Sequence, residues 1–138
     1  MGLPPYAALS ELTAAADDGR LEAVCRRHAI RLLSVFGSSA RAGEAPRDLD
    51  AAIRFEPGRR GDLLAVYDDL ARLSGSDELD LLVLDDAGPV ARERALVGSV
   101  ALYESESGAY ATAQMAAMCE RMETEWLRRL DLETMARQ

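Results

Sequence analysis

The chain contains no lysine: its 16 basic residues are all arginine. This excludes chemistry that needs a lysine amine, such as a Walker-type phosphate-binding lysine or a Schiff base. His28 is the only histidine, so the sequence also excludes a zinc site built from several histidines. Because His28 falls on the apolar face of an expected helix ahead of the first strand, we favour a packing or surface role for it over that of a general base.

Cysteine, positive charge and long apolar runs are equally scarce. The two cysteines, Cys25 and Cys119, share no pairing motif, and we expect both to be reduced thiols. The net charge of −8 argues against nucleic acid as the main partner. No stretch approaches the roughly 18 apolar residues of a membrane span, and the N-terminus lacks a signal-peptide pattern. The sequence therefore predicts a soluble, cytoplasmic protein with no membrane partner.

What is present is the composition of an ordinary globular domain, with 138 residues, 49% hydrophobic and 29% charged. We find no repeat or dividing linker, so we expect one domain over 1–138, with a core at 20–104 and a C-terminal helix at 110–130. Strands that alternate with helices indicate an α/β (α+β) fold, a small mixed sheet with flanking helices. The expected strands span 30–36, 49–55, 79–84 and 100–103, and the expected helices span 10–16, 20–29, 60–73, 89–97 and 110–130.

Two aspartates, Asp48 and Asp50, stand at the start of the second expected strand. Residues two apart on a strand point to the same face, about 6–7 Å apart along the backbone, so their carboxylates repel unless a cation lies between them. Oxygen-rich sites of this kind suit Mg²⁺ or Mn²⁺, and such a pair can bridge two ions. Taken alone, the motif is more simply explained as a polar strand start at the surface, because short motifs recur by chance.

A third aspartate, Asp80, interrupts the apolar strand expected at 79–84. A lone carboxylate is costly to bury in such a strand unless it is paired or bound to a metal ion. If this strand neighbours the one that carries Asp48 and Asp50, the three carboxylates converge. The alternative is that Asp80 lies at the solvent-facing end of its strand, as we expect for Asp85 and Asp86.

The segment Phe36-Gly37-Ser38-Ser39 follows directly from the first apolar strand. A glycine at this point permits close approach and unusual backbone dihedrals. The amides and hydroxyl that follow can donate hydrogen bonds to phosphate oxygens at a helix N-terminus. By itself a Gly-Ser pair is a weak signal, and its simpler explanation is a plain turn with a helix cap.

The order of these elements is more specific than any one of them. An apolar strand leads into Gly37-Ser38, Asp48-Leu49-Asp50 begins ten residues after Ser38, and Asp80 lies thirty residues after Asp50, beyond a helix. In this order the chain resembles the DNA polymerase β-like nucleotidyltransferases, and among them the small minimal nucleotidyltransferases of the MNT antitoxin group. The resemblance runs from about 32 to 84, and more loosely to 104.

The resemblance implies the nucleotidyltransferase fold and a role for each motif residue. It implies catalytic and metal-binding roles for the three carboxylates, Asp48, Asp50 and Asp80, and a nucleotide-binding role for the turn, Gly37, Ser38 and Ser39. Two departures concern the loop between these motifs. Ala42 intervenes between Arg41 and Gly43, and Arg47 stands where the family often has serine. Arg41 has two open interpretations, a phosphate contact or a salt bridge with Glu44.

The same resemblance implies an activity and a partner. The chain would use ATP as substrate and two Mg²⁺ ions as cofactors, and would transfer AMP to a tyrosine of a partner HEPN-type toxin. Two alternatives stay open, namely a nucleotidyltransferase for a small molecule such as an aminoglycoside, and a non-catalytic antitoxin that neutralises its partner by contact. Three retained carboxylates speak against the second alternative.

The last expected helix carries a stripe of large residues spaced four, three and four apart: Met115, Cys119, Met122 and Trp126. We favour the interpretation that this stripe packs on the chain's own sheet. The alternative is a partner face, because Met and Trp are common anchors at interfaces. In the resembled family this region meets the cognate toxin.

Overall fold

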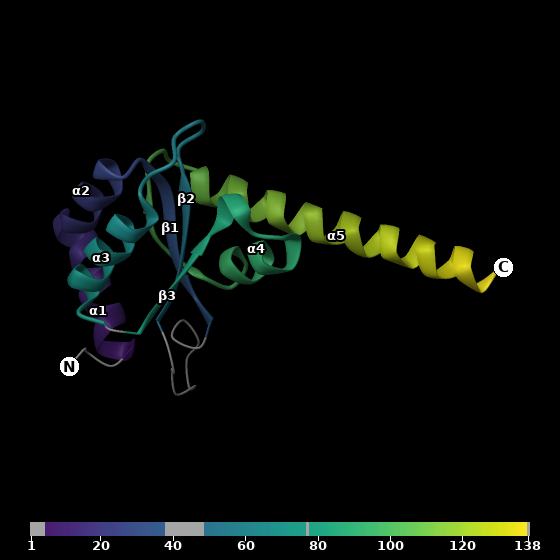
Figure 1. The fold of residues 1–138 in the computed structure, drawn as a ribbon, viewed down its shortest axis with the longest axis horizontal. Coiled ribbons are helices and arrows are strands. Elements are labelled where there is room, and N and C mark those ends of the chain that lie inside the picture. Colours follow the sequence, from purple (N-terminus) through teal and green to yellow (C-terminus); the bar gives the residue numbers. More distant parts are fainter. Residues whose placement is uncertain (1–4, 38–48, 77, 138) are drawn as a thin grey trace.

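The structure is a computed structural model that describes residues 5–37, 49–76 and 78–137. The described elements begin with two helices and two strands, after which helices and strands alternate to the last helix (Figure 1). The helices are α1 (Pro5–Asp18), α2 (Arg20–Arg27), α3 (Leu63–Ser74), α4 (Pro89–Leu96) and α5 (Ala109–Ala136). The strands are β1 (Ile30–Phe36), β2 (Leu49–Phe55), β3 (Leu79–Val83) and β4 (Val100–Glu104), and one turn of 3₁₀ helix, Leu84–Asp86, follows β3.

The strands form one sheet in the order β3-β2-β1-β4. The central strand β1 pairs antiparallel with both β2 and β4, whereas β2 pairs parallel with β3. A parallel pair needs a crossover connection, and α3 supplies it between β2 and β3. The expected α/β fold with a small mixed sheet is therefore confirmed.

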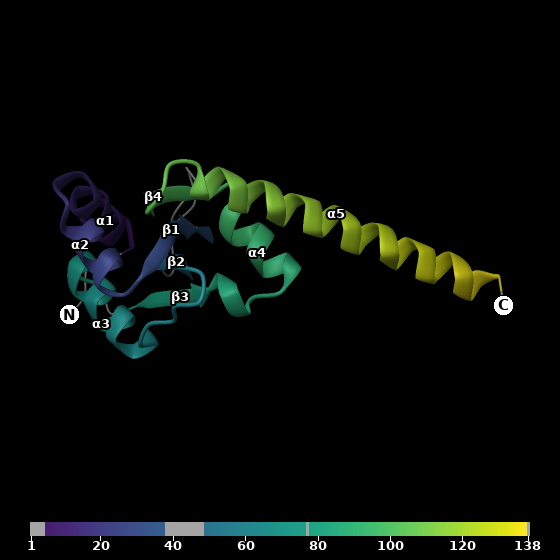
Figure 2. The same cartoon turned by 90° about the horizontal axis from the view of Figure 1, so that it is seen from above.

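Helices cover both faces of the sheet (Figures 1 and 2). One face packs against α1, α2 and α3, and the other packs against α4 and the first turns of α5. The side chains of β2 alternate between these two cores, because successive strand residues point to opposite faces. Ala51, Ile53 and Phe55 lie in the core under α1–α3, while Ala52 lies in the core under α4 and α5. By this alternation Asp50 belongs to the α4 face.

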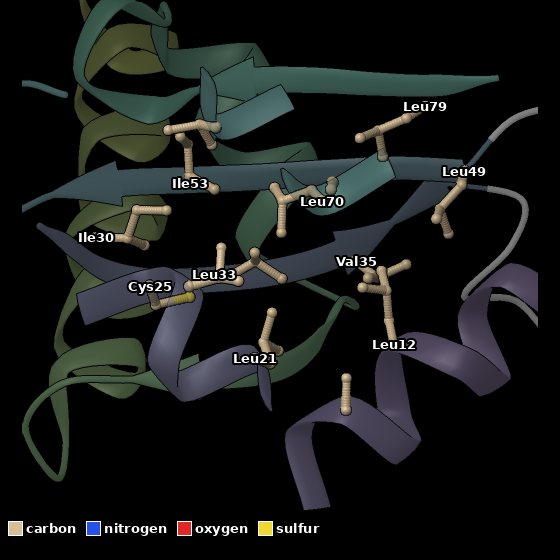
Figure 3. Packing of buried hydrophobic residues seen from close by; sticks show 14 of the residues in the cluster. Leu12, Leu21, Cys25, Ile30, Leu33, Val35, Leu49, Ile53, Leu70 and Leu79 are labelled. Atoms are coloured by element: carbon tan, nitrogen blue, oxygen red, sulfur yellow. The ribbon is translucent and has the colours of Figure 1, made fainter. Parts of the chain in front are cut away.

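The larger core lies between the sheet and α1–α3 (Figure 3). Leu33 of β1 and Ile53 of β2 are fully buried there, beside Leu21 and Cys25 of α2. Each fully buried Leu or Ile side chain contributes about 1.5–3 kcal/mol. Burial also raises the pKa of the Cys25 thiol to about 12. Both cysteines are free thiols, as predicted, with Cys25 buried and Cys119 exposed.

Element boundaries follow local capping chemistry. Helix α3 begins at Leu63 rather than near residue 60, because the Asp62 carboxylate accepts hydrogen bonds from the backbone N–H groups of Leu64 and Ala65 at 3.1 and 3.4 Å. It ends where Gly75 adopts the left-handed conformation, with φ 71°. Helix α1 begins before the expected start, at Pro5, and α5 continues past the expected end at 130 to Ala136.

Helix α5 has two different faces. Ala109, Ala113 and Ala117 are buried against the body of the protein, at the four-residue spacing of one helix side. The opposite side carries the stripe of Met115, Cys119, Met122 and Trp126, which we call the outer stripe. Its three largest members are exposed, Met115 by 66%, Met122 by 69% and Trp126 by 61%. The expectation that this stripe packs on the chain's own sheet is therefore wrong.

The short alanines explain this outcome, because they let α5 approach α4 closely while the large side chains point outward. Beyond Ala117 the helix projects away from the sheet (Figures 1 and 2). None of the helices in the described ranges has the length and apolar character that a membrane crossing needs.

Two ion pairs of opposite polarity join α4 to α5. Arg92 Nη1 donates to the Glu120 carboxylate at 2.8 and 2.9 Å, and Arg121 Nε lies 3.2 Å from Glu93 Oε2. These four side chains are about one third exposed, so each pair contributes modestly by itself. Together they fix how the two helices lie against each other.

Candidate active site

Asp50 and Asp80 are direct neighbours in the sheet. The parallel register of β2 and β3 pairs Asp50 with Asp80, and Ala52 with Leu82. Neighbouring strands lie about 4.8 Å apart, and paired residues of parallel strands point to the same face. Both carboxylates therefore stand at the same end of the sheet, on the face that α4 covers.

Asp80 reaches this position without being buried. Strand β3 is an edge strand, and the Asp80 side chain is exposed. Of the two interpretations left open by the sequence, solvent exposure of Asp80 is the one that the structure shows, and an exposed carboxylate keeps its hydration. The argument for a shared site rests instead on the register that places Asp80 beside Asp50. Asp85 and Asp86 are exposed after the strand, as expected.

Gly37, which directly follows β1, lies next to the Asp50 carboxylate. Its φ is +74°, a conformation that favours glycine, and it follows Phe36, which pairs with Asp50 across the β1–β2 ladder. A Cβ atom added to Gly37 would lie 2.3 Å from Asp50 Oδ2. The turn after β1 and the Asp50 carboxylate thus approach each other so closely that only glycine fits at this point.

Four other residues singled out in the sequence lie outside the described residues: Ser38, Ser39, Arg41 and Asp48. Asp48 directly precedes Leu49, the first residue of β2. Within the described ranges, no group of three or more His, Cys, Asp or Glu side chains could hold a metal ion. The three-carboxylate site thus remains a prediction, of which the structure brings two members together.

A cleft of about 200 Å³ opens beside these two carboxylates. Asp50 and Asp80 form its acidic side, apolar side chains of the sheet form its floor, and α4 forms its far wall. Its full lining is Phe36, Asp50, Asp80, Leu81, Leu82, Ala91 and Arg94. The cleft is therefore lined by two carboxylate residues, Asp50 and Asp80, and by one arginine, Arg94.

The donor chemistry fits Mg²⁺. Carboxylate oxygens are the ligands this ion prefers, and it commonly binds through one or two carboxylates together with substrate phosphates. Asp50 and Asp80 are side by side and open to the cleft, so both could ligate an ion there. Asp48, the third predicted ligand, lies outside the described residues.

His28 takes no part in this site. It sits two residues before β1, whereas the site lies at the far end of that strand, about 26 Å away along an extended chain. His28 Nε2 lies 2.6 Å from Asp69 Oδ2 and so joins α2 to α3. The hydrogen bond from His28 lowers the pKa of Asp69, and the nearby Arg27 adds to this effect. The packing role expected for His28 agrees with this geometry.

Arg94 is the cleft residue that the sequence analysis missed. It stands in the charged run Arg92-Glu93-Arg94 on α4, and sequence alone does not tell which of the three turns toward the sheet. Helical spacing from Ala91 offers a signal, because residues three apart share a helix side and both of these line the cleft.

No protein-family model and no curated protein matches the sequence. Solved structures do match the fold. A toxin–antitoxin crystal structure with AMP-PNP superposes with a TM-score of 0.64 at 15% identity, covering 86% of this chain and 98% of that one. A tri-AMPylated Shewanella oneidensis HEPN toxin in complex with MNT antitoxin gives a TM-score of 0.62 at 16% identity, covering 90% of this chain and 98% of the other. A toxin–antitoxin MntA–HepT structure gives 0.60 at 16% identity, covering 86% and 96%.

The chain therefore has the nucleotidyltransferase fold, with two register-paired carboxylates and a glycine turn at one end of its sheet. More narrowly, its fold is that of the minimal nucleotidyltransferases found in MNT toxin–antitoxin complexes. The resemblance inferred from the order of motifs is thus confirmed at the level of the fold.

Proposed function

We propose that this chain is a nucleotidyltransferase that serves as the antitoxin of a HEPN/MNT pair and transfers AMP from ATP to a tyrosine of its partner toxin. The observation that carries the proposal is the pairing of Asp50 with Asp80 directly beside Gly37. Two carboxylates and a phosphate-binding turn at one end of a sheet are what metal-assisted nucleotidyl transfer requires. The comparisons support the choice of substrate and partner, since one similar structure contains AMP-PNP and another contains an AMPylated HEPN toxin.

Each site residue has a part in the proposed reaction. Asp48, Asp50 and Asp80 would hold Mg²⁺, which when bound offsets phosphate charge and lowers the pKa of the acceptor hydroxyl. Gly37, Ser38 and Ser39 would bind the triphosphate through backbone amides and hydroxyls. The tyrosine oxygen would form a bond to the α-phosphorus as the bond to pyrophosphate breaks, and Asp80 would accept the hydroxyl proton.

The exposure of Asp80 suits an acceptor that belongs to another protein. An edge strand leaves this carboxylate open to solvent, so a side chain presented by a partner can approach it directly. The outer stripe of α5 offers the partner a second contact, because exposed Met and Trp side chains are typical anchors at protein interfaces. In this proposal the toxin docks on α5 and brings its tyrosine to the cleft.

The test is transfer of label from α-³²P-ATP to a HEPN-type toxin that binds this chain, in the presence of Mg²⁺. We expect the wild type to label the toxin, and Asp50→Ala combined with Asp80→Ala to reduce labelling by at least about 100-fold. Asp17→Ala is a matched control, because Asp17 is an exposed carboxylate on α1, on the other side of the sheet. No labelling by the wild type, or equal labelling by the double variant, would contradict the catalytic proposal. If the unlabelled toxin were still silenced by the double variant, neutralisation by contact would replace catalysis.

A further inference from the structure

Three successive charged residues on α4 differ in what they face. Arg92 pairs with Glu120 and Glu93 pairs with Arg121, so both turn toward α5. Successive residues on a helix point about 100° apart, so the next residue turns to another side. That residue is Arg94, which lines the cleft together with Asp50 and Asp80.

The backbone that carries Arg94 is held on both sides. The buried Ser34 hydroxyl of β1 donates to the Ala95 carbonyl at 2.9 Å. The Tyr110 hydroxyl and the Gln114 amide of α5 each donate to the Leu96 carbonyl at 2.8 Å. The last turn of α4 is therefore fixed to the sheet and to α5, and Arg94 extends its side chain into the cleft from a rigid base.

The Arg94 guanidinium is available for a ligand. Its side chain is exposed, and among the residues that the structure describes no carboxylate lies within ion-pair distance of it. Several other arginines of the chain are engaged, as Arg60 is with Asp86 and Arg31 is with Glu56. A guanidinium at the mouth of an acidic cleft can offset the repulsion between those carboxylates and an incoming anion.

The anion expected in this cleft carries phosphate groups. The chain has no lysine, so protein cations near the phosphates must be arginines. Arginine suits this role, because its planar donors match two phosphate oxygens at once. We propose that Arg94 binds the phosphate oxygens of the nucleotide from the α4 side of the cleft, opposite Asp50 and Asp80. This inference rests on the proposed nucleotidyltransferase function and adds a residue to its substrate site.

Binding of AMP-PNP with Mg²⁺ to the full chain, measured by isothermal titration calorimetry, tests the inference without any acceptor protein. We expect Arg94→Ala to raise the dissociation constant by about 10- to 100-fold, the range of a charge-assisted hydrogen bond. Arg94→Lys keeps the charge but loses the planar donors, so it should recover part of this loss. Arg59→Ala is the matched control, because Arg59 is also exposed but follows the opposite end of β2.

The outcomes separate the two proposals. If the wild type binds AMP-PNP and Arg94→Ala binds it equally well, the role of Arg94 is refuted and the proposed function stands. If the wild type does not bind AMP-PNP with Mg²⁺, both fail. A loss that Arg59→Ala reproduces would show a general charge effect and would also overturn the inference. Unfolding midpoints of Arg94→Ala and the wild type should agree, since the exposed side chain carries no packing.

Discussion

Replacing Gly37 with alanine should have two effects, backbone strain at a positive φ and displacement of the Asp50 carboxylate. Gly37→Ala puts a side chain at φ +74°, where a non-glycine residue costs about 1–2 kcal/mol. It also places Cβ 2.3 Å from Asp50 Oδ2 and 3.2 Å from Asp50 Cγ, so the carboxylate must move. The short Asp50 side chain can rotate away at little cost in stability, but its carboxylate then leaves its place beside Asp80.

Gly58→Ala supplies the control for backbone strain. Gly58 has nearly the same φ, +73°, and an added Cβ would meet nothing within 4 Å. Both variants should therefore lose about 1–2 kcal/mol of unfolding free energy, seen as a melting temperature about 4–8 °C lower. Only Gly37→Ala displaces a site residue, and a displacement of about 1 Å can cost on the order of 100-fold in rate.

The two assays are urea unfolding and transfer of labelled AMP to the toxin. We expect the variants to be alike in the first and to differ by about 100-fold or more in the second. Transfer by Gly37→Ala at the rate of Gly58→Ala would refute the reasoning that Gly37 exists to make room for the Asp50 carboxylate. A much greater stability loss in Gly37→Ala would show instead that Asp50 cannot rotate away.

Two further predictions concern α5 and the thiols. Trp126→Ala should weaken toxin binding in calorimetry by about 2 kcal/mol or more while leaving the unfolding free energy within about 0.5 kcal/mol, because this side chain is an exposed interface anchor. Leu127 is also exposed but lies about 100° around the helix, so Leu127→Ala should bind the toxin like the wild type. An equal loss in both variants would remove the outer stripe as the docking face. In a titration with a thiol reagent at pH 8, Cys119 should react readily and Cys25 only after unfolding, because burial raises the pKa of Cys25 to about 12. Rapid reaction of two thiols in the folded protein would contradict the buried position of Cys25.

The central strands could be predicted from the sequence with their boundaries. The apolar run before Gly37 and the alternation of Ala51, Ile53 and Phe55 each reflect local geometry, and β1 and β2 have the expected limits. Such features depend on neighbours in sequence, which is why one sequence suffices to find them.

The site could be predicted only in part, because strand pairing is not local. The register that joins Asp50 to Asp80 is set by how α3 crosses between their strands, and the position of β3 at the sheet edge depends on the whole topology. The sequence therefore left open whether Asp80 is buried or solvent-facing, and the structure shows it exposed. The prediction that the outer stripe of α5 packs on the sheet was wrong for the same kind of reason. Periodicity shows that a stripe exists, but it does not show which side of the helix packs against the rest of the protein.

The crossed ion pairs between α4 and α5 have a thermodynamic consequence for the proposed antitoxin. They connect the helix proposed to receive the toxin with the helix whose Arg94 forms a wall of the nucleotide cleft. If toxin docking changes the affinity for ATP by some factor through this connection, ATP must change the affinity for the toxin by the same factor. The affinity for the toxin would then depend on the cellular ATP concentration. A titration of either ligand in the presence of the other would measure the coupling between the two binding events.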